Sequence, residues 1–183
     1  MSILAIDPGP VFSAWVTLDA ETRQPLQFSK EASEVVLRRL HDPLEKIDGI
    51  RLRDPYAEGI EMVAIEMVAS YGMAVGAEVF ETCVWIGRFA EVCTNMRVPY
   101  LGGNVEVQQI TRKPIKLHHC RSAAAKDSNI TQALIDRFAP GVPNRGKGHK
   151  ASPGWFYGFR ADIWQAYALG VYAADLRAGG KRA

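Results

Sequence analysis

A charged side chain interrupts the apolar run MVAIEMV at residues 62–68. Both alternating sets of positions in this run are apolar, which is typical of a central parallel strand that is covered on both faces. A carboxylate inside such a strand is costly unless it is paired, hydrogen-bonded or bound to a cation. The run therefore predicts an α/β fold with a buried sheet, and Glu66 requires a cationic partner from another part of the chain, because the run itself contains none.

Two further carboxylates stand at the ends of predicted elements. Asp7 is the first charge after the buried strand ILAI, and Asp162 opens the last predicted helix in FRADIWQAYALG. Alone, Asp7 is either a turn residue or part of a site, and Asp162 is either a helix N-cap or part of a site. If the two strands are neighbours and the helix packs across them, both meet Glu66 at one edge of the sheet. Three carboxylates that close together require a metal ion such as Mg²⁺; a buried ion pair of Glu66 with a basic residue is the alternative.

The remaining hydrophobic pattern predicts a mixed sheet flanked by helices. Three leading strands should form a meander, followed by helices that alternate with two more strands. The predicted strands are 2–6, 11–19, 26–29, 62–68 and VPYLGG at 98–103. The predicted helices are 31–47, which Pro43 should kink or divide, 74–96, 129–139 and 161–178, with a Gly/Pro-rich loop at 140–158. The fold class is therefore α/β with a central mixed five-stranded sheet.

Length and composition limit the classes of protein to which this chain can belong. At 183 residues and 48% hydrophobic content, residues 1–178 are expected to form a single domain, followed by a short basic tail at 179–183. No apolar run is long enough for a membrane span, and no signal peptide is evident, so we expect a soluble protein of the cytoplasm. Three cysteines without CxxC spacing argue against a disulfide framework or zinc cluster.

Positive charge is concentrated in one segment. Residues 111–150 hold nine Lys or Arg against two acidic residues, a net charge of +7, whereas the rest of the chain carries −5. Such segregation indicates a polyanionic partner, with a solvated basic face as the alternative. His118, His119 and Cys120 lie in this segment without a zinc-binding spacing, and we interpret them as part of a DNA-facing surface.

Four stretches together resemble the RuvC-like Holliday junction resolvases of the ribonuclease H-like superfamily, particularly divergent phage members. They are LAIDPG at 4–9, VAIEMV at 63–68, AKDSNITQAL at 125–134 and RADIWQAYALG at 160–170. The resemblance implies a ribonuclease H-like fold and a homodimeric endonuclease that nicks four-way junctions and other branched DNA. It also implies two Mg²⁺ or Mn²⁺ ions per active site, no small-molecule cofactor and no membrane association. The cytoplasm would be that of a bacterium or of a phage-infected host cell.

The resemblance also assigns roles to single residues. Asp7, Glu66 and Asp162 become metal ligands, and Lys126 becomes a lysine near the scissile phosphate, where it would stabilise the transition state. Asp127 beside it is interpreted as a helix cap. The residues predicted to contact DNA are Tyr71, which would stack on junction bases, and the basic residues Lys113, Lys116, Arg121, Lys126, Lys147 and Lys150.

Gln165 departs from the family pattern, which usually carries a second aspartate at this position. Either the site remains active with three carboxylates, with Gln165 as a further catalytic residue that ligates through its oxygen, or the chain is a junction-binding protein with an impaired nuclease. On the first hypothesis a second ion binds weakly, and Gln165→Asp should raise activity at low Mg²⁺. A ribonuclease that acts on RNA–DNA hybrids stays open, whereas a sugar-kinase-like phosphotransferase would need a second Gly-rich phosphate loop that the sequence lacks.

Overall fold

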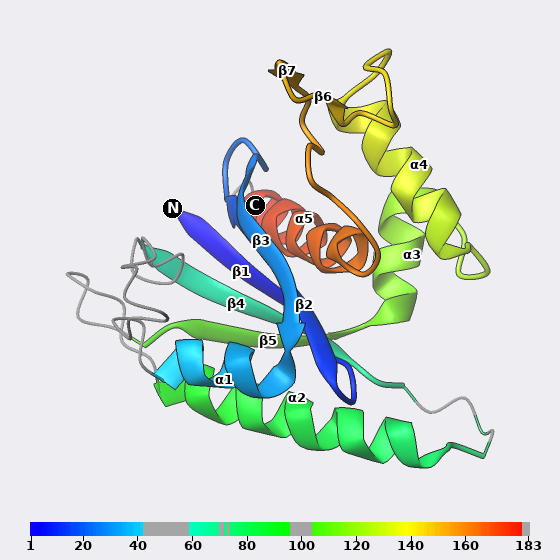
Figure 1. Ribbon diagram of the computed structural model, residues 1–183. Helices are drawn as coiled ribbons and strands as arrows, with labels where there is room; N and C mark the ends of the chain where they lie inside the picture. Colours follow the sequence, from blue (N-terminus) through cyan, green and yellow to red (C-terminus); the bar gives the residue numbers. More distant parts are fainter. Residues whose placement is uncertain (42–58, 70–71, 73, 96–103, 181–183) are drawn as a thin grey trace.

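A five-stranded sheet forms the centre of the computed structural model, which describes residues 1–41, 59–69, 72, 74–95 and 104–180 (Figure 1). The first three strands form an antiparallel meander, and the last two join β1 in parallel, in the order β3-β2-β1-β4-β5. The strands are β1 (Ser2–Asp7), β2 (Phe12–Asp19), β3 (Pro25–Ala32), β4 (Ile60–Met67) and β5 (Glu106–Thr111). The mixed five-stranded sheet, its leading meander and its buried parallel β4 confirm the sequence prediction.

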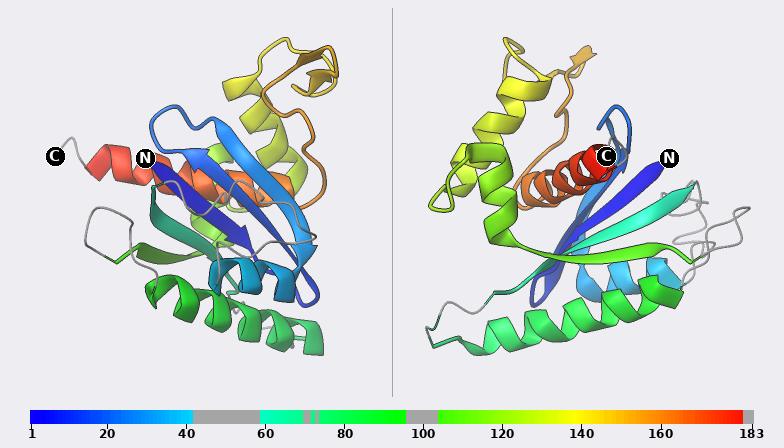
Figure 2. Two further views of the ribbon diagram at one scale, coloured as in Figure 1. Left: turned by 60° about the vertical axis from the view of Figure 1, so that its left-hand side comes forward. Right: turned by 180° about the vertical axis from the view of Figure 1, so that it is seen from behind.

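Helices cover both faces of this sheet, as the two views of Figure 2 show. One layer consists of α1 (Ser33–His41) and α2 (Ala77–Asn95), and the other of α3 (Arg112–Cys120), α4 (Asp127–Phe138) and α5 (Ile163–Gly180). A small hairpin of β6 (Gly148–His149) and β7 (Ser152–Pro153) follows α4. None of the helices in the described part of the chain is long and apolar enough to cross a membrane.

Strand alternation divides the core between the two faces. Ile3 and Ala5 pack with α5, whereas Leu4 and Ile6 pack with α1 and α2. On β4 the same division places Met62 and Ala64 on the α5 side. Continuing the alternation by two residues on each strand carries Asp7 and Glu66 onto that same face.

Helix α5 is the most deeply buried helix of the described residues. Tyr167 is fully buried, and its hydroxyl accepts a hydrogen bond from the Trp155 indole at 2.9 Å and donates one to the Arg23 carbonyl at 2.8 Å. At Gly170 the helix lies so close to the sheet that an added Cβ would overlap a methyl carbon of Leu18 and lie 3.1 Å from Cβ of Ala5. This close packing fixes the start of α5 over the ends of the central strands.

Several predicted boundaries differ from the structure. The helix predicted at 74–96 is α2, the helix expected at 129–139 begins at Asp127, and the last helix begins at Ile163 and runs to Gly180, into the predicted tail. The predicted strand at 98–103 and the expected kink at Pro43 lie outside the described residues. The fifth strand, β5, and helix α3 were missed, because EVQQIT is largely polar and Pro114 suggests a helix break, although proline is tolerated in the first turn of a helix.

We predict opposite effects of adding one methyl group at two helical glycines. Gly170→Ala should lower the free energy of unfolding by about 1–3 kcal/mol, because the methyl group overpacks the contact with Ala5 and Leu18. Gly87→Ala in α2, where nothing lies within 4 Å, should raise it by up to about 1 kcal/mol through helix propensity. Urea denaturation measures both, and a stabilised Gly170→Ala variant would contradict the close packing of α5 on the sheet.

Candidate active site

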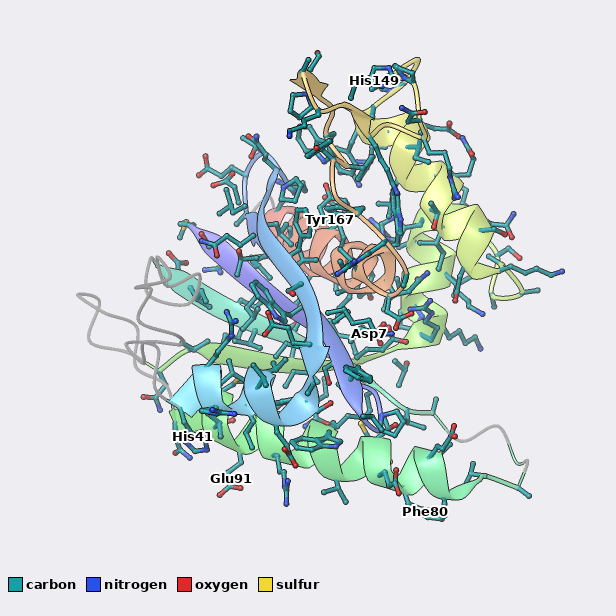
Figure 3. All side chains as sticks on the ribbon, in the orientation of Figure 1. Asp7, His41, Phe80, Glu91, His149 and Tyr167 are labelled. Atoms are coloured by element: carbon teal, nitrogen blue, oxygen red, sulfur yellow. The ribbon has the colours of Figure 1, made fainter. Side chains whose placement is uncertain are left out.

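The register of the sheet places acidic and basic side chains side by side at one end. Ile6 of β1 pairs with Ile65 of β4, so the next residues, Asp7 and Glu66, are neighbours on the α5 face. On the other side of Asp7, the register continues through Ala14 of β2 to Lys30 of β3. Figure 3 shows Asp7 at the end of β1, on the side of the sheet that α3 and α5 cover.

Arg112 is the cationic partner of Glu66. It is the first residue of α3, directly after β5, and its Nη1 donates to Glu66 Oε2 at 2.7 Å. Its Nη2 donates to Asp127 Oδ1 at 2.6 Å and also to the amide oxygen of Gln165. Burial by itself would lower the pKa of Arg112, but the neighbouring carboxylates outweigh burial and raise it, so the guanidinium stays charged. The buried ion pair considered as an alternative for Glu66 is therefore present.

Asp162 pairs with a different cation. Its carboxylate accepts a hydrogen bond from Lys30 Nζ at 2.5 Å, and both side chains are partly exposed, at 48% and 34%. At the start of α5, the backbone carbonyl of Asp162 accepts hydrogen bonds from the N–H groups of Gln165 and Ala166. Its side chain accepts none from a described N–H group of the helix, so it does not act as a side-chain cap. An exposed ion pair of this kind contributes little free energy, so Asp162 can exchange Lys30 for another cation at small cost.

Asp7 is the carboxylate without a dedicated partner. No hydrogen bond or ion pair from another described residue reaches its side chain. Burial raises the pKa of Asp7 well above its ordinary value, the negative charge of Glu66 raises it further, and Arg112 opposes both. Burial also raises the pKa of Glu66, against the opposing effect of Arg112. One guanidinium therefore compensates the two carboxylates only in part when both are ionised.

The three predicted ligands lie at the same end of the sheet but are not gathered around one point. Asp7 is affected electrostatically by both Glu66 and Asp162, yet each of the latter is held by its own cation. Among the residues that the structure describes, no three His, Cys, Asp or Glu side chains form a group able to hold a metal ion. Their carboxylate oxygens are nevertheless the hard ligands that Mg²⁺ and Mn²⁺ prefer. A metal would be held by Asp7 and Glu66, with Asp162 after release of Lys30.

The start of α4 differs from the prediction at Asp127. Asp127 is not the helix cap: Lys126 occupies the N-cap position, and the Asp127 carboxylate pairs with Arg112 instead. The backbone N–H of Lys126 donates to Asn129 Oδ1 at 2.8 Å, and the Lys126 side chain is exposed. Gln165 is buried in the first turn of α5, where its oxygen accepts from Arg112.

The predicted DNA-contacting residues are distributed along α3, α4 and the β6–β7 hairpin. Within the described ranges, none of the basic ones forms an ion pair, which leaves their charges available. Tyr71 lies outside the described residues. The basic ones are Lys113 and Lys116 on α3, Arg121 after its end, Lys126 before α4, and Lys147 and Lys150 beside β6.

Both histidines of the HHC sequence contact α5, and their place on a DNA-facing surface stays a prediction. His118 Nε2 contacts Asp175 Oδ2 at 2.8 Å, and His119 Nε2 contacts the Ala168 carbonyl at 2.9 Å. Burial lowers the pKa of His119 to about 4, so its ring is neutral near pH 7 and donates to that carbonyl. Both rings thus attach α3 to α5, and this attachment positions Arg112 at the other end of α3.

Arg112 and Lys30 were not recognised as site residues from the sequence. Sequence reasoning placed Arg112 only within the basic segment and gave Lys30 no role. The signal for Arg112 was the need of Glu66 for a cation, but the sequence does not say which of 22 Lys and Arg residues supplies it. That identity depends on the parallel pairing of β4 with β5.

We predict that neutralising Asp7 stabilises the fold at neutral pH. Because the pKa of Asp7 is raised in the folded protein, stability is lost as the pH rises from the unfolded value of 3.8 through the folded value. Asp7→Asn should therefore raise the thermal unfolding midpoint at pH 7 and leave it nearly unchanged at about pH 3, where both states are protonated. Glu91→Gln, at an exposed position of α2, is the control. A lower midpoint for Asp7→Asn at pH 7 would contradict the raised pKa of Asp7.

Comparison with known proteins identifies the fold. No protein-family model and no curated protein matches the sequence. Among solved structures, Thermus thermophilus RuvC matches with a TM-score of 0.60 and 16% identity over 98% of this chain and 97% of RuvC. T. thermophilus RuvC in complex with Holliday junction substrate matches with a TM-score of 0.57 and 16% identity over 98% and 96% of the two chains. The chain therefore has the α/β ribonuclease H-like fold of RuvC, as its motifs predicted.

Proposed function

We propose that the chain is a metal-dependent, structure-selective endodeoxyribonuclease that nicks four-way junctions and other branched DNA. The observation that carries the proposal is the placement of Asp7 beside Glu66, at the strand ends under α5, in a chain that shares its fold with RuvC. A RuvC structure that holds a Holliday junction substrate supports the substrate class.

The chemistry proposed for this site is phosphodiester hydrolysis. Divalent ions, when bound, supply a hydroxide nucleophile and stabilise the charge on the leaving oxygen. Asp7 and Glu66 would hold the metal from adjacent strands, and Asp162 would approach it from the start of α5. A bound cation would favour the ionised form of Asp7, whose charge the described neighbours compensate only in part.

The basic residues on α3, before α4 and beside β6 would hold the DNA backbone. Helices α3 and α4 and strand β6 lie on the same side of the sheet as α5, the side that Asp7 also faces, so a duplex arm bound there would extend from the site (Figure 1). Phosphate contacts of this kind fix the position of DNA without reading its sequence. A four-way junction is two-fold symmetric, and we propose a homodimer with one active site for each strand that is cut.

The second candidate function is junction binding with an impaired nuclease. The contact between Arg112 and Gln165 favours this second candidate. Position 165, where the family pattern has an acidic residue, holds a neutral amide, and that amide is bound to a guanidinium. The two candidates differ in cleavage and share DNA binding, so one assay separates them.

We predict symmetric nicking of a labelled four-way junction in Mg²⁺ or Mn²⁺, with little cutting of linear duplex or RNA–DNA hybrid. EDTA should abolish nicking, and Asp7→Asn or Glu66→Gln should lower its rate by about 100-fold or more, the scale of removing one electrostatic interaction from a transition state. Glu91→Gln should cut like the unmodified protein. Tight junction binding without nicking in either metal would overturn the nuclease in favour of the second candidate, and preferred cutting of the hybrid would overturn the substrate class.

We predict that the basic surface determines how binding depends on salt. Replacing Lys113 and Lys150 by glutamine should weaken junction binding and reduce the slope of log K against log[salt] by about 0.9 for each phosphate that is no longer neutralised. Arg38 is exposed on α1, which covers the opposite face of the sheet, so Arg38→Gln should leave the slope unchanged. Fluorescence anisotropy in EDTA over a salt series measures binding alone, and equal slopes for all variants would exclude these lysines from the interface.

A further inference from the structure

Arg112 has an unusual set of contacts for a residue of a DNA-facing helix. Its guanidinium is directed inward, with 19% of the side chain exposed, and it joins Glu66 of β4, Asp127 of α4 and Gln165 of α5. Three elements are therefore linked through one cation at the end of the sheet. These acceptors are the oxygen atoms that would otherwise surround a divalent ion.

The residue type at position 165 fits this cation. With Glu66 and Asp127 already bound to Arg112, a third carboxylate would add negative charge that one guanidinium does not compensate. The neutral amide of Gln165 supplies a hydrogen-bond acceptor without adding that charge. A glutamine at position 165 is thus compatible with Arg112, because it accepts a hydrogen bond from the guanidinium without adding a third negative charge.

Carboxylate oxygens that are not bound to Arg112 remain available to a metal ion beside Glu66. Within the described part of the chain, the Glu66 carboxylate accepts a hydrogen bond only through Oε2, and the Asp7 carboxylate has no hydrogen bond or ion pair. Asp162 adds a carboxylate whose exposed ion pair with Lys30 is weak. The donor set that is open to a metal therefore suits one divalent ion, and the donor set around Arg112 does not suit a second.

We propose that Arg112 is a resident cation that takes the place of one of two divalent ions, so that the site binds a single Mg²⁺ or Mn²⁺ at Asp7 and Glu66. The inference rests on the proposed metal-dependent function and deepens it. It also changes the expectation for Gln165→Asp, because the new carboxylate would pair with Arg112 instead of recruiting a metal.

The ion count of the unmodified protein is the first test. Purified full-length protein is titrated with Mn²⁺, and free Mn²⁺ is followed by electron paramagnetic resonance, with calorimetry as a second measurement. We expect one ion per chain, and loss of that ion in Asp7→Asn. Two ions per chain, or none, would overturn the inference without any substitution at Arg112.

Variants at the two paired positions form the second test. Gln165→Asp alone should still bind one ion, and Arg112→Lys, which keeps the charge, should also bind one. The double variant Arg112→Gln, Gln165→Asp should bind two, because Glu66, Asp127 and the new carboxylate then lack a cation. Arg38→Gln controls for the loss of a positive charge. A second ion in Gln165→Asp alone, or one ion in a folded double variant, would overturn the inference.

Nicking measured on the same samples separates this inference from the proposed function. If the protein binds one ion and cuts no DNA substrate, the role of Arg112 stands and the nuclease proposal fails. If the protein cuts junctions and binds two ions, the nuclease stands and the role of Arg112 fails. Should the double variant not fold, the counts for the unmodified protein and for Gln165→Asp still decide the matter.

Discussion

The burial of Glu66 within β4 is the constraint on which the arrangement of the site depends. A carboxylate at that position must have a cation close by, and Arg112 provides it at 2.7 Å. Arg112 reaches Glu66 because β5 pairs with β4 in parallel and α3 begins at the next residue. The end of the sheet, the start of α3 and the first turn of α5 are thus connected through one guanidinium.

On β1 and β4, apolar core residues are followed directly by the acidic residues of the candidate site. Residues 3–6 of β1 and 62–65 of β4 are buried apolar side chains divided between two cores, and the acidic residues come directly after them on the α5 face. On both strands the packed apolar core therefore ends where the charged residues begin. Helix α5 contributes to both, since Tyr167 and Gly170 pack in the core while Gln165 contacts Arg112.

Strands β1 to β4 and the placement of the acidic residues could be predicted from the sequence because both follow from local pattern, whereas the largely polar β5 could not. Continuous apolar runs at residues 3–6 and 62–68 predict the buried strands, and the charged residue in or after each run marks the edge of the sheet. The partners of these charges depend on long-range pairing, which the pattern does not contain. Asp127 illustrates this limit: a helix start favours a capping interpretation, and only the position of α3 beside α4 shows that its carboxylate binds Arg112.

The central claim is that Asp7 and Glu66 form a cation site beside a guanidinium that is already in place. Anomalous diffraction from crystals of the protein soaked in Mn²⁺ tests it most directly. We expect an anomalous peak in contact with the carboxylates of Asp7 and Glu66, with Arg112 still bound to the other oxygen of Glu66. A soaked crystal with manganese bound only elsewhere, or with Arg112 displaced from Glu66 by the ion, would contradict it.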